Sequence, residues 1–192
     1  DWSSASYFYS IVALSPIGTQ IDLSAYKPNS LQGDAVLKNI YKELGVESSF
    51  NETTLSLKKL AEPQSKQLTL DLANAPDIAQ TIAVTCLGLE IGCNLTGLHT
   101  LKIKETDRLV ALQNEIKKLG TSIEITDNSL HLKSPNKLNS SIHIATYNDH
   151  RMAMAFAPLG LKTQLFIDDA DVVSKSYPDF WSDLSALGFE LN

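Results

Sequence analysis

Apolar and polar positions along the chain follow two spacings. Apolar residues at alternate positions predict strands, and apolar residues three or four positions apart predict helices. Turns rich in glycine, proline and asparagine separate these segments. On this pattern we expect helices over residues 1–14, 34–44, 74–89, 104–119, 152–159 and 176–187. We expect strands over residues 19–23, 46–50, 54–57, 68–72, 94–103, 122–125, 129–132, 141–145, 164–167 and 189–191.

The order of these elements recurs three times, which indicates an internal repeat. Each round reads strand, apolar helix, strand, amphipathic helix and hairpin. The expected fold class is therefore α/β (α+β), with three repeated βαβαββ units packed around buried helices. The approximate units of this single lobe are 1–66, 67–135 and 136–192. The first round lacks a leading strand and the last lacks a hairpin, so we expect a piece of a longer protein.

Turn and cap residues mark the rounds. An aspartate introduces the first helix of each round and a Leu-Gly pair ends the second, at Asp1, Asp77 and Asp149 and at Gly45, Gly120 and Gly188. A further turn is expected around Pro28 and Gly33. Asn74 is expected to cap the helix that Pro76 enters. The Ser-Tyr-Pro-Asp run at 176–179 has the form of a capping box, with aspartate in place of glutamate.

The run Lys-Ile-Lys-Glu-Thr-Asp-Arg-Leu at 102–109 breaks two local rules at one place. It is predicted to open an amphipathic helix, so Lys104 and Arg108 share a face. Like charges four residues apart repel, and cations at a helix N-terminus oppose its dipole. An anion held by both cations and by the free helix N–H groups resolves this conflict. The alternative is an exposed helix start whose charges are offset by Glu105 and Asp107.

Composition narrows the classes of function. With 192 residues and an apolar fraction of 43%, the chain can bury a core. A net charge of −6 and a pI near 5.1 argue against a nucleic-acid surface and suit a small anionic ligand. No apolar run reaches membrane-spanning length, and no cysteine or histidine set has zinc spacing. We expect no metal, cofactor or membrane, and expect Cys86 and Cys93 to be reduced core thiols.

Unusual polar residues gather at the starts of the predicted helices. If the rounds pack side by side, these starts meet, and the set is Asp77, Lys104, Glu105, Arg108, His150, Arg151 and Lys175. Cations and helix N-termini bind phosphate and carboxylate groups, while Asp77, Glu105 and Lys175 could transfer protons. Each residue also has a simpler interpretation. Asp77 can serve the helix dipole, His150 can be a half-buried capping residue, and Lys175 can be solvated.

Five blocks of sequence, in one order along nearly the whole chain, carry a family resemblance. They are Asp-Trp-Ser-Ser-Ala-Ser-Tyr-Phe at 1–8, Pro-Asp at 76–77, Lys-Glu-Thr-Asp-Arg-Leu at 104–109, Asn-Asp-His-Arg-Met-Ala-Met at 148–154 and Lys-Ser-Tyr-Pro-Asp-Phe at 175–180. This set resembles the motifs of 5-enolpyruvylshikimate-3-phosphate synthase. The resemblance implies an enzyme of two similar lobes, each with three βαβαββ units. This chain resembles the C-terminal lobe only.

The resemblance also implies a reaction. The 5-hydroxyl of shikimate 3-phosphate attacks C2 of phosphoenolpyruvate, C3 is protonated, and the tetrahedral adduct then loses phosphate. Asp77 matches the carboxylate that contacts the substrate hydroxyls and is a candidate base. Glu105 matches a second acid or base near the phosphoenolpyruvate methylene. Lys175 matches a cation that binds phosphoenolpyruvate and can donate a proton.

The other matched residues are binding residues. Arg108 and Arg151 match the clamps for phosphoenolpyruvate, and Lys104 matches a contact to the shikimate hydroxyls and bridging oxygen. His150 is carried over only as a member of the Arg151 block. Thr100 stands where many members of the family have an asparagine, so a shikimate contact is expected to differ.

The implied whole protein is a cytoplasmic, monomeric transferase of the shikimate pathway to aromatic amino acids. Its partners are phosphoenolpyruvate, shikimate 3-phosphate and the missing N-terminal lobe, without which this lobe should be inactive. Three alternatives remain: a UDP-N-acetylglucosamine enolpyruvyl transferase, a non-catalytic anion-binding domain and an RNA-handling relative. The motif blocks favour the shikimate enzyme, the carboxylates in the cluster argue against a simple anion binder, and the net charge of −6 argues against RNA.

Overall fold

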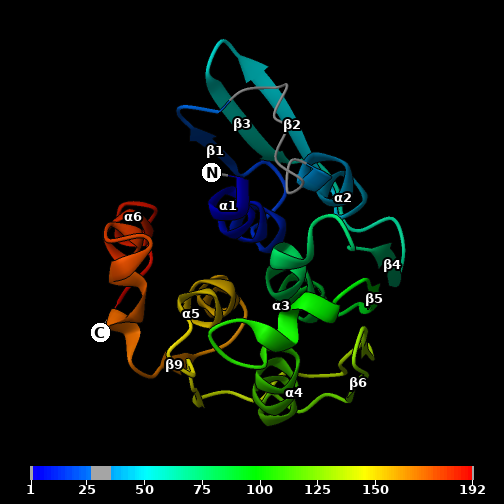
Figure 1. The fold of residues 1–192 in the computed structure, drawn as a ribbon. Helices are drawn as coiled ribbons and strands as arrows, with labels where there is room; N and C mark the ends of the chain where they lie inside the picture. The colour runs from blue at the N-terminus through cyan, green and yellow to red at the C-terminus, as the bar shows by residue number, and fades with distance from the viewer. Residues whose placement is uncertain (1, 27–35, 192) are drawn as a thin grey trace.

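Three buried helices form the centre of the molecule. The computed structural model describes residues 2–26 and 36–191. Helix α3 (Ala79–Gly88) packs against both α1 (Trp2–Leu14) and α5 (His150–Phe156), and strands surround the three helices (Figure 1). Every residue of α3, and every residue of α1 except Ser4, is buried. A helix that is buried all round belongs to the interior, so these helices define the core.

The strands pair in three separate sheets. An antiparallel sheet has the order β1-β3-β2, from β1 (Gln20–Leu23), β2 (Val46–Asn51) and β3 (Thr54–Lys59). A second has the order β4-β5-β7-β6, from β4 (Gln67–Asp71), β5 (Gly92–Thr96), β6 (Ile123–Ile125) and β7 (Leu130–Leu132), with only β4 and β5 parallel. The third pairs β8 (Ile142–Ile144) and β9 (Leu165–Ile167) in parallel.

The sheet orders follow the predicted repeat. The arrangement of β5, β7 and β6 repeats that of β1, β3 and β2, and the parallel pair β8 and β9 repeats β4 and β5. The predicted α/β fold with βαβαββ units is therefore present. The unit boundaries at 66 and 135 stay a prediction.

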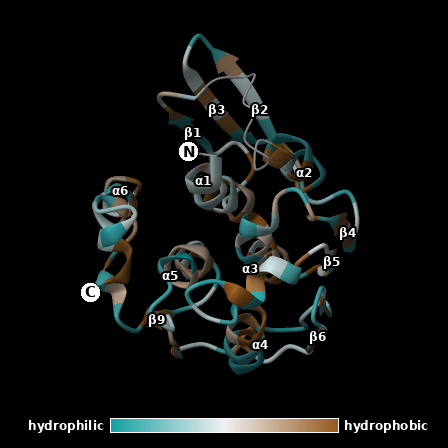
Figure 2. Ribbon diagram, viewed as in Figure 1, coloured by the Kyte–Doolittle hydropathy of each residue, from teal (hydrophilic) through white to brown (hydrophobic). Residues whose placement is uncertain are grey.

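The outer helices and short 3₁₀ turns complete the fold. The outer helices are α2 (Leu37–Glu43), α4 (Arg108–Lys118) and α6 (Phe180–Ala186). The 3₁₀ turns are η2 (Pro76–Ile78), η3 (His99–Ile103), η4 (Ala157–Leu161) and η5 (Ala170–Lys175). Helix α4 carries hydrophobic and hydrophilic residues on different faces (Figure 2), and its apolar face is buried, as the helical spacing predicts.

Hydroxyl groups between the central helices are paired with one another. Thr85 of α3 donates to the Ser10 hydroxyl of α1 at 2.7 Å, and the Tyr41 hydroxyl lies 2.8 Å from that of Thr85. Close packing continues at the C-terminal end of α3, where a Cβ on Gly88 would lie 2.6 Å from Cδ2 of Leu14. Small residues and satisfied hydroxyls thus let these helices approach closely and hold their starts at fixed relative positions.

The predicted helix over residues 104–119 begins four residues later than expected, at Arg108. Asp107 is its N-cap, and the Asp107 carboxylate accepts hydrogen bonds from the backbone N–H groups two and three residues further on, each at 3.2 Å. Lys104 instead has an extended backbone at the end of η3. Lys104 and Arg108 therefore do not share a helix face, and residues 99–103 form η3 rather than strand.

Two other predicted helix starts are wrong. Asn74 is not a cap. The turn η2 begins at Pro76, so the position that precedes it is Ala75, and no side chain caps the turn. Pro76 itself has no N–H group to be capped. The predicted capping box at 176–179 does not form, since the Ser176 N–H donates back to Val173 and so ends η5. Asp179, which directly precedes α6, makes no side-chain capping bond.

Four further expectations concern the chain ends and the stretch before α2. No strand forms over residues 189–191, since no described strand pairs with them. Predicted features at Asp1, at the turn around Pro28 and Gly33, and at residues 34–35 lie outside the described residues.

The interior thiols agree with the sequence prediction. Cys86 and Cys93 are both free and buried. The hydrogen bond between them, together with burial, raises the pKa of Cys86 well above its usual range.

In the described part of the chain, no group of histidine, cysteine, aspartate and glutamate could hold a metal ion. None of the helices described is both long and apolar enough to cross a membrane.

We predict that a buried lysine makes stability depend on pH. The Lys59 amine is buried and donates to the Leu44 carbonyl at 2.9 Å, and burial lowers its pKa. As pH rises toward the ordinary lysine value of about 10.4, the unfolded chain keeps more protons than the folded one, so the cost of burying the charged amine is relieved and stability rises. The free energy of unfolding, measured by urea titration, should rise relative to that of Lys59→Met.

The matched control is Lys58→Met, which removes an exposed lysine from the same strand. A difference between the unchanged protein and Lys59→Met that stayed constant over this pH range would contradict the prediction.

Candidate active site

Asp77 is in contact with three cations, which come from two other segments of the chain. Its Oδ1 lies 3.1 Å from Lys104 Nζ and 3.2 Å from Arg108 Nη1, and its Oδ2 lies 3.4 Å from Arg151 Nη2. Asp77 belongs to η2 before α3, Arg108 opens α4, and Arg151 lies in the first turn of α5. The starts of three helical segments therefore converge, as the repeat predicts.

Arg108 lies beneath this group and holds it together. Its side chain is only 1% exposed. Its Nε donates to Asp149 Oδ2 at 2.6 Å, and its Nη2 donates to Glu105 Oε2 at 2.6 Å and to Asp149 Oδ1 at 3.3 Å. With the contact to Asp77, one guanidinium is shared by three carboxylates.

Asp149 links the guanidinium to the start of α5. This carboxylate is fully buried, and its Oδ1 accepts the backbone N–H of Arg151 at 2.9 Å. It is therefore both the N-cap of α5 and a ligand of Arg108. From the sequence, an anion is expected on free N–H groups at helix starts. At the starts of α4 and α5 some of these N–H groups are already bonded, to Asp107 and to Asp149.

The cluster is neutral before any ligand binds. Its cations are Lys104, Arg108 and Arg151, and its carboxylates are Asp77, Glu105 and Asp149. Glu105 is the most exposed of the paired side chains at 45%. An incoming anion must therefore compete with carboxylates, and it meets Glu105, Lys104 and Arg151 before the buried Arg108.

The surrounding charges keep Asp77 ionised. Burial alone would raise the pKa of Asp77, but Arg151, Lys104 and Arg108 together lower it below the ordinary value. Burial lowers the pKa of His150, against the opposing effect of Asp149, so this half-buried ring is neutral at pH 7. The site thus offers an ionised proton acceptor beside paired cations.

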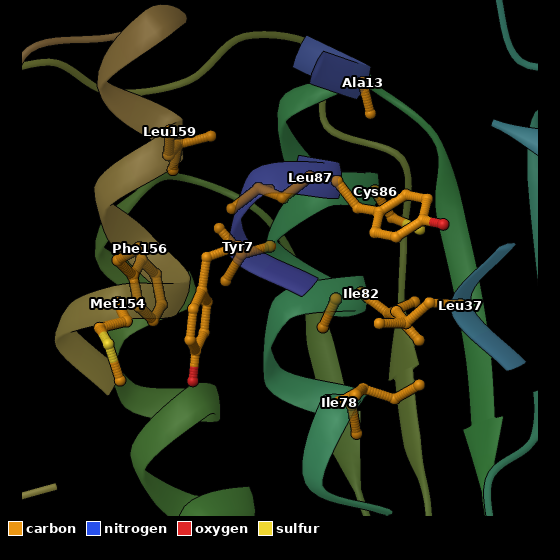
Figure 3. Close-up of a cluster of buried hydrophobic side chains, with 14 of the residues drawn as sticks. Tyr7, Ala13, Leu37, Ile78, Ile82, Cys86, Leu87, Met154, Phe156 and Leu159 are labelled. Carbon is orange, nitrogen blue, oxygen red and sulfur yellow. The ribbon is translucent and has the colours of Figure 1, made fainter. Parts of the chain in front are cut away.

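Tyr7 connects the cluster to the core. Figure 3 shows its side chain between α5 and α3, with the hydroxyl directed toward the N-terminal end of α5. There it hydrogen-bonds Arg151, while burial raises the pKa of Tyr7 to about 12. Nearby on η3, the buried Thr100 hydroxyl has no hydrogen-bond partner among the described residues.

Lys175 is the one predicted catalytic residue that does not join the cluster. It is exposed at the end of η5, and it forms no ion pair with any residue in 2–26 or 36–191. Lys175 lies in η5, which packs against α5, so it is on an element next to the one that carries Arg151. Five other predicted residues lie together, with His150 beside Arg151: Asp77, Lys104, Glu105, Arg108 and Arg151. The hydroxyl of Thr100 makes no hydrogen bond to any of them.

Comparison with known proteins assigns the arrangement to a family. The model of the family described as EPSP synthase (3-phosphoshikimate 1-carboxyvinyltransferase) matches residues 1–184. The chain belongs to the EPSP synthase family. The 3-phosphoshikimate 1-carboxyvinyltransferase of Bacteroides fragilis YCH46 is 43% identical over 98% of this chain and 46% of its own length. That of Methanospirillum hungatei JF-1 is 35% identical over 96% of this chain and 42% of its own length.

Solved structures agree on the fold. An EPSP synthase from Acinetobacter baumannii superposes with a TM-score of 0.78 at 21% identity, covering 96% of this chain and 45% of the solved one. A second structure of that enzyme gives 0.78 at 20% identity, covering 99% and 46%. The chain thus has the fold of one EPSP synthase lobe and spans about half the length of the curated relatives it matches.

Within this EPSP synthase lobe, sequence reasoning missed Asp149, Asp107 and Tyr7 as parts of the site. The capping roles of Asp107 and Asp149 could have been predicted from the sequence, because an aspartate directly before a helical run is a common N-cap. The second bond of Asp149, to Arg108, had no local signal. Tyr7 had only the weak one that a buried tyrosine hydroxyl usually finds a partner.

We predict that Asp149→Asn destabilises the lobe by about 3–5 kcal/mol, because it leaves the buried Arg108 guanidinium without its fully buried counter-charge. The measurement is the free energy of unfolding from urea titration. Asp127→Asn is the control, since Asp127 pairs with Lys102 on the surface and its side chain is 92% exposed. Equal unfolding free energies for the two variants would show that the buried pair has no special weight.

Proposed function

We propose that this chain is the C-terminal lobe of a 3-phosphoshikimate 1-carboxyvinyltransferase. That enzyme moves the enolpyruvyl group of phosphoenolpyruvate to the 5-hydroxyl of shikimate 3-phosphate and releases phosphate. The observation that carries the proposal is the convergence of Lys104, Arg108 and Arg151 on an ionised Asp77, in a chain of the EPSP synthase family. Two anionic substrates need cations, and an attacking hydroxyl needs a proton acceptor.

Asp77 is the proposed acceptor for the hydroxyl proton. As the hydroxyl oxygen bonds to C2 of phosphoenolpyruvate, its proton passes to Asp77. With three cations around it Asp77 is a weak base, because its pKa is lowered. When phosphoenolpyruvate takes up Arg151 and shikimate 3-phosphate takes up Lys104, those cations stabilise the Asp77 carboxylate less. Its basicity then rises in the complex that needs it.

Glu105 is the proposed acid and base at C3. It is the most exposed carboxylate of the cluster, and it is held by Arg108 at 2.6 Å. Glu105 is ionised in the free cluster, so it acts as an acid only after it has bound a proton, which in the first step passes to C3 as C2 gains the hydroxyl oxygen. In the second, C3 loses a proton as the bond from C2 to the phosphate oxygen breaks, which regenerates the double bond. A group that gives and then takes this proton must face the substrate, as the exposure of Glu105 allows.

Lys175 and the second lobe complete the proposal. Lys175 is proposed to bind phosphoenolpyruvate and to donate a proton after the two lobes close, since η5 packs against the helix that carries Arg151. Most contacts to shikimate 3-phosphate are assigned to the other lobe. The free thiols Cys86 and Cys93 support a reducing, cytoplasmic setting, and we propose that the whole protein is a monomer.

We predict that this chain alone does not turn over, but that a chimera does. The chimera joins the N-terminal half of the Bacteroides fragilis relative to this chain. Holding both reactants in contact can contribute up to about 7–11 kcal/mol, and one wall of a site cannot supply this. Phosphate release should require both substrates and occur only with the chimera. Substantial release by the chain alone, or a folded chimera that binds neither substrate, would sink the proposal.

We predict that Asp77 and Arg151 affect different kinetic constants in that chimera. Asp77→Asn removes the proton acceptor but keeps the shape, so kcat should fall about 10²–10⁴-fold. Arg151→Ala should mainly raise the KM for phosphoenolpyruvate. Asp127→Asn, which alters a surface carboxylate paired with Lys102, is the control. If Asp77→Asn kept near-normal kcat, the helix-dipole interpretation of Asp77 would be the better one.

A further inference from the structure

One face of α4 holds the segment before α5 at both of its ends. Arg108 and Glu115 lie two turns apart on that face, and both are buried. Arg108 Nε donates to Asp149 Oδ2 at 2.6 Å, and Glu115 Oε2 accepts the backbone N–H of Ala145 at 3.1 Å. The segment from Ala145 to Asp149 is therefore attached to α4 by its first and its last residue.

Between these attachments the backbone adopts an unfavourable conformation. Tyr147 and Asn148 both have a φ of 55°, the left-handed region that residues with side chains rarely occupy. The Asp149 N–H donates to the Thr146 carbonyl at 2.9 Å, which closes a tight turn around this pair. A strained turn persists only where its surroundings hold it in place.

Glu115 of α4 keeps this turn in place. The Tyr147 hydroxyl donates to Glu115 Oε1 at 2.7 Å, so both carboxylate oxygens bind the same segment. Lys118 balances the buried charge with a contact of 2.5 Å to Glu115, and it also donates to the His143 carbonyl of β8 at 3.1 Å. None of these residues contacts the ion cluster around Asp77 directly.

We infer that Glu115 and Tyr147 are positioning residues for the cluster. Their bond holds the left-handed turn, the turn places Asp149, and Asp149 orients Arg108 and starts the helix that carries Arg151. The inference rests on the proposed function for its ligand, phosphoenolpyruvate. The placement of Arg108 can be measured without any ligand.

The test variant is Tyr147→Phe, which removes the hydroxyl and keeps the ring. The Tyr147 hydroxyl also accepts a longer hydrogen bond from Asn114 Nδ2, at 3.4 Å. The control is Tyr9→Phe, which removes a tyrosine hydroxyl bonded to Ser48 at 2.6 Å, away from the cluster. By NMR, exchange of the Arg108 Nε–H proton with water should be about tenfold faster in Tyr147→Phe, because local opening exposes it. The same exchange should be unchanged in Tyr9→Phe. In the chimera, Tyr147→Phe should raise the phosphoenolpyruvate KM about tenfold with little change in kcat.

A second variant covers the case in which Tyr147→Phe fails to fold. Glycine adopts positive φ without steric cost, so Asn148→Gly should slow exchange of the Arg108 Nε–H. Where Tyr147→Phe does fold, adding Asn148→Gly should restore slow exchange, which a loss of general stability would not predict.

Three results would overturn the inference: unchanged Arg108 exchange in Tyr147→Phe, an equal effect of Tyr9→Phe, or no effect of Asn148→Gly in either background. Faster exchange in Tyr147→Phe would support the positioning role even if the chimera never bound phosphoenolpyruvate. The missing binding would then count against the proposed function and not against the positioning role.

Discussion

The buried guanidinium of Arg108 is the contact on which the rest of the site depends. A charge with 1% exposure must have every donor directed at an acceptor, because an unpaired buried donor is costly. The acceptors come from the turn before α3, the segment before α4 and the start of α5. Satisfying one side chain thus fixes three parts of the chain relative to one another. The site is built from this constraint rather than from the rigidity of any single loop.

The core explains why three distant segments can meet this demand. Helices α1 and α3 are buried almost all round, and the hydroxyls between them are paired, so their relative positions are set over their whole length. The segments that start α3, α4 and α5 meet at one place beside this core. Tyr7 extends the arrangement into the site, since a residue of the core helix α1 contacts Arg151. Packing and site geometry are therefore coupled through the helix starts.

Periodicity and turn residues were enough to predict the elements, the repeat and the meeting of helix starts, because these follow from local pattern. The family and the site residues came from motif resemblance. Pattern failed where a side chain competes for the backbone: Asp107 moved the start of α4 past Lys104, and Pro76 displaced the Asn74 cap. It also failed where partners are distant in sequence. No local feature pairs Arg108 with Asp149, and none separates Lys175 from the cluster.

The three carboxylates of the cluster also offset the repulsion between its three cations. Three cations brought together without counter-charges would repel, and a lobe built only to bind anions would be strained until its ligand arrived. Asp77, Glu105 and Asp149 remove that repulsion in the free protein. For Asp77 and Glu105 this opposes the proposed chemistry, since a carboxylate paired with cations is a poorer base. The conflict is resolved if the substrate itself takes up the cations. Binding and activation of the base are then one electrostatic event, and the exposed members of the cluster are the ones that must exchange partners.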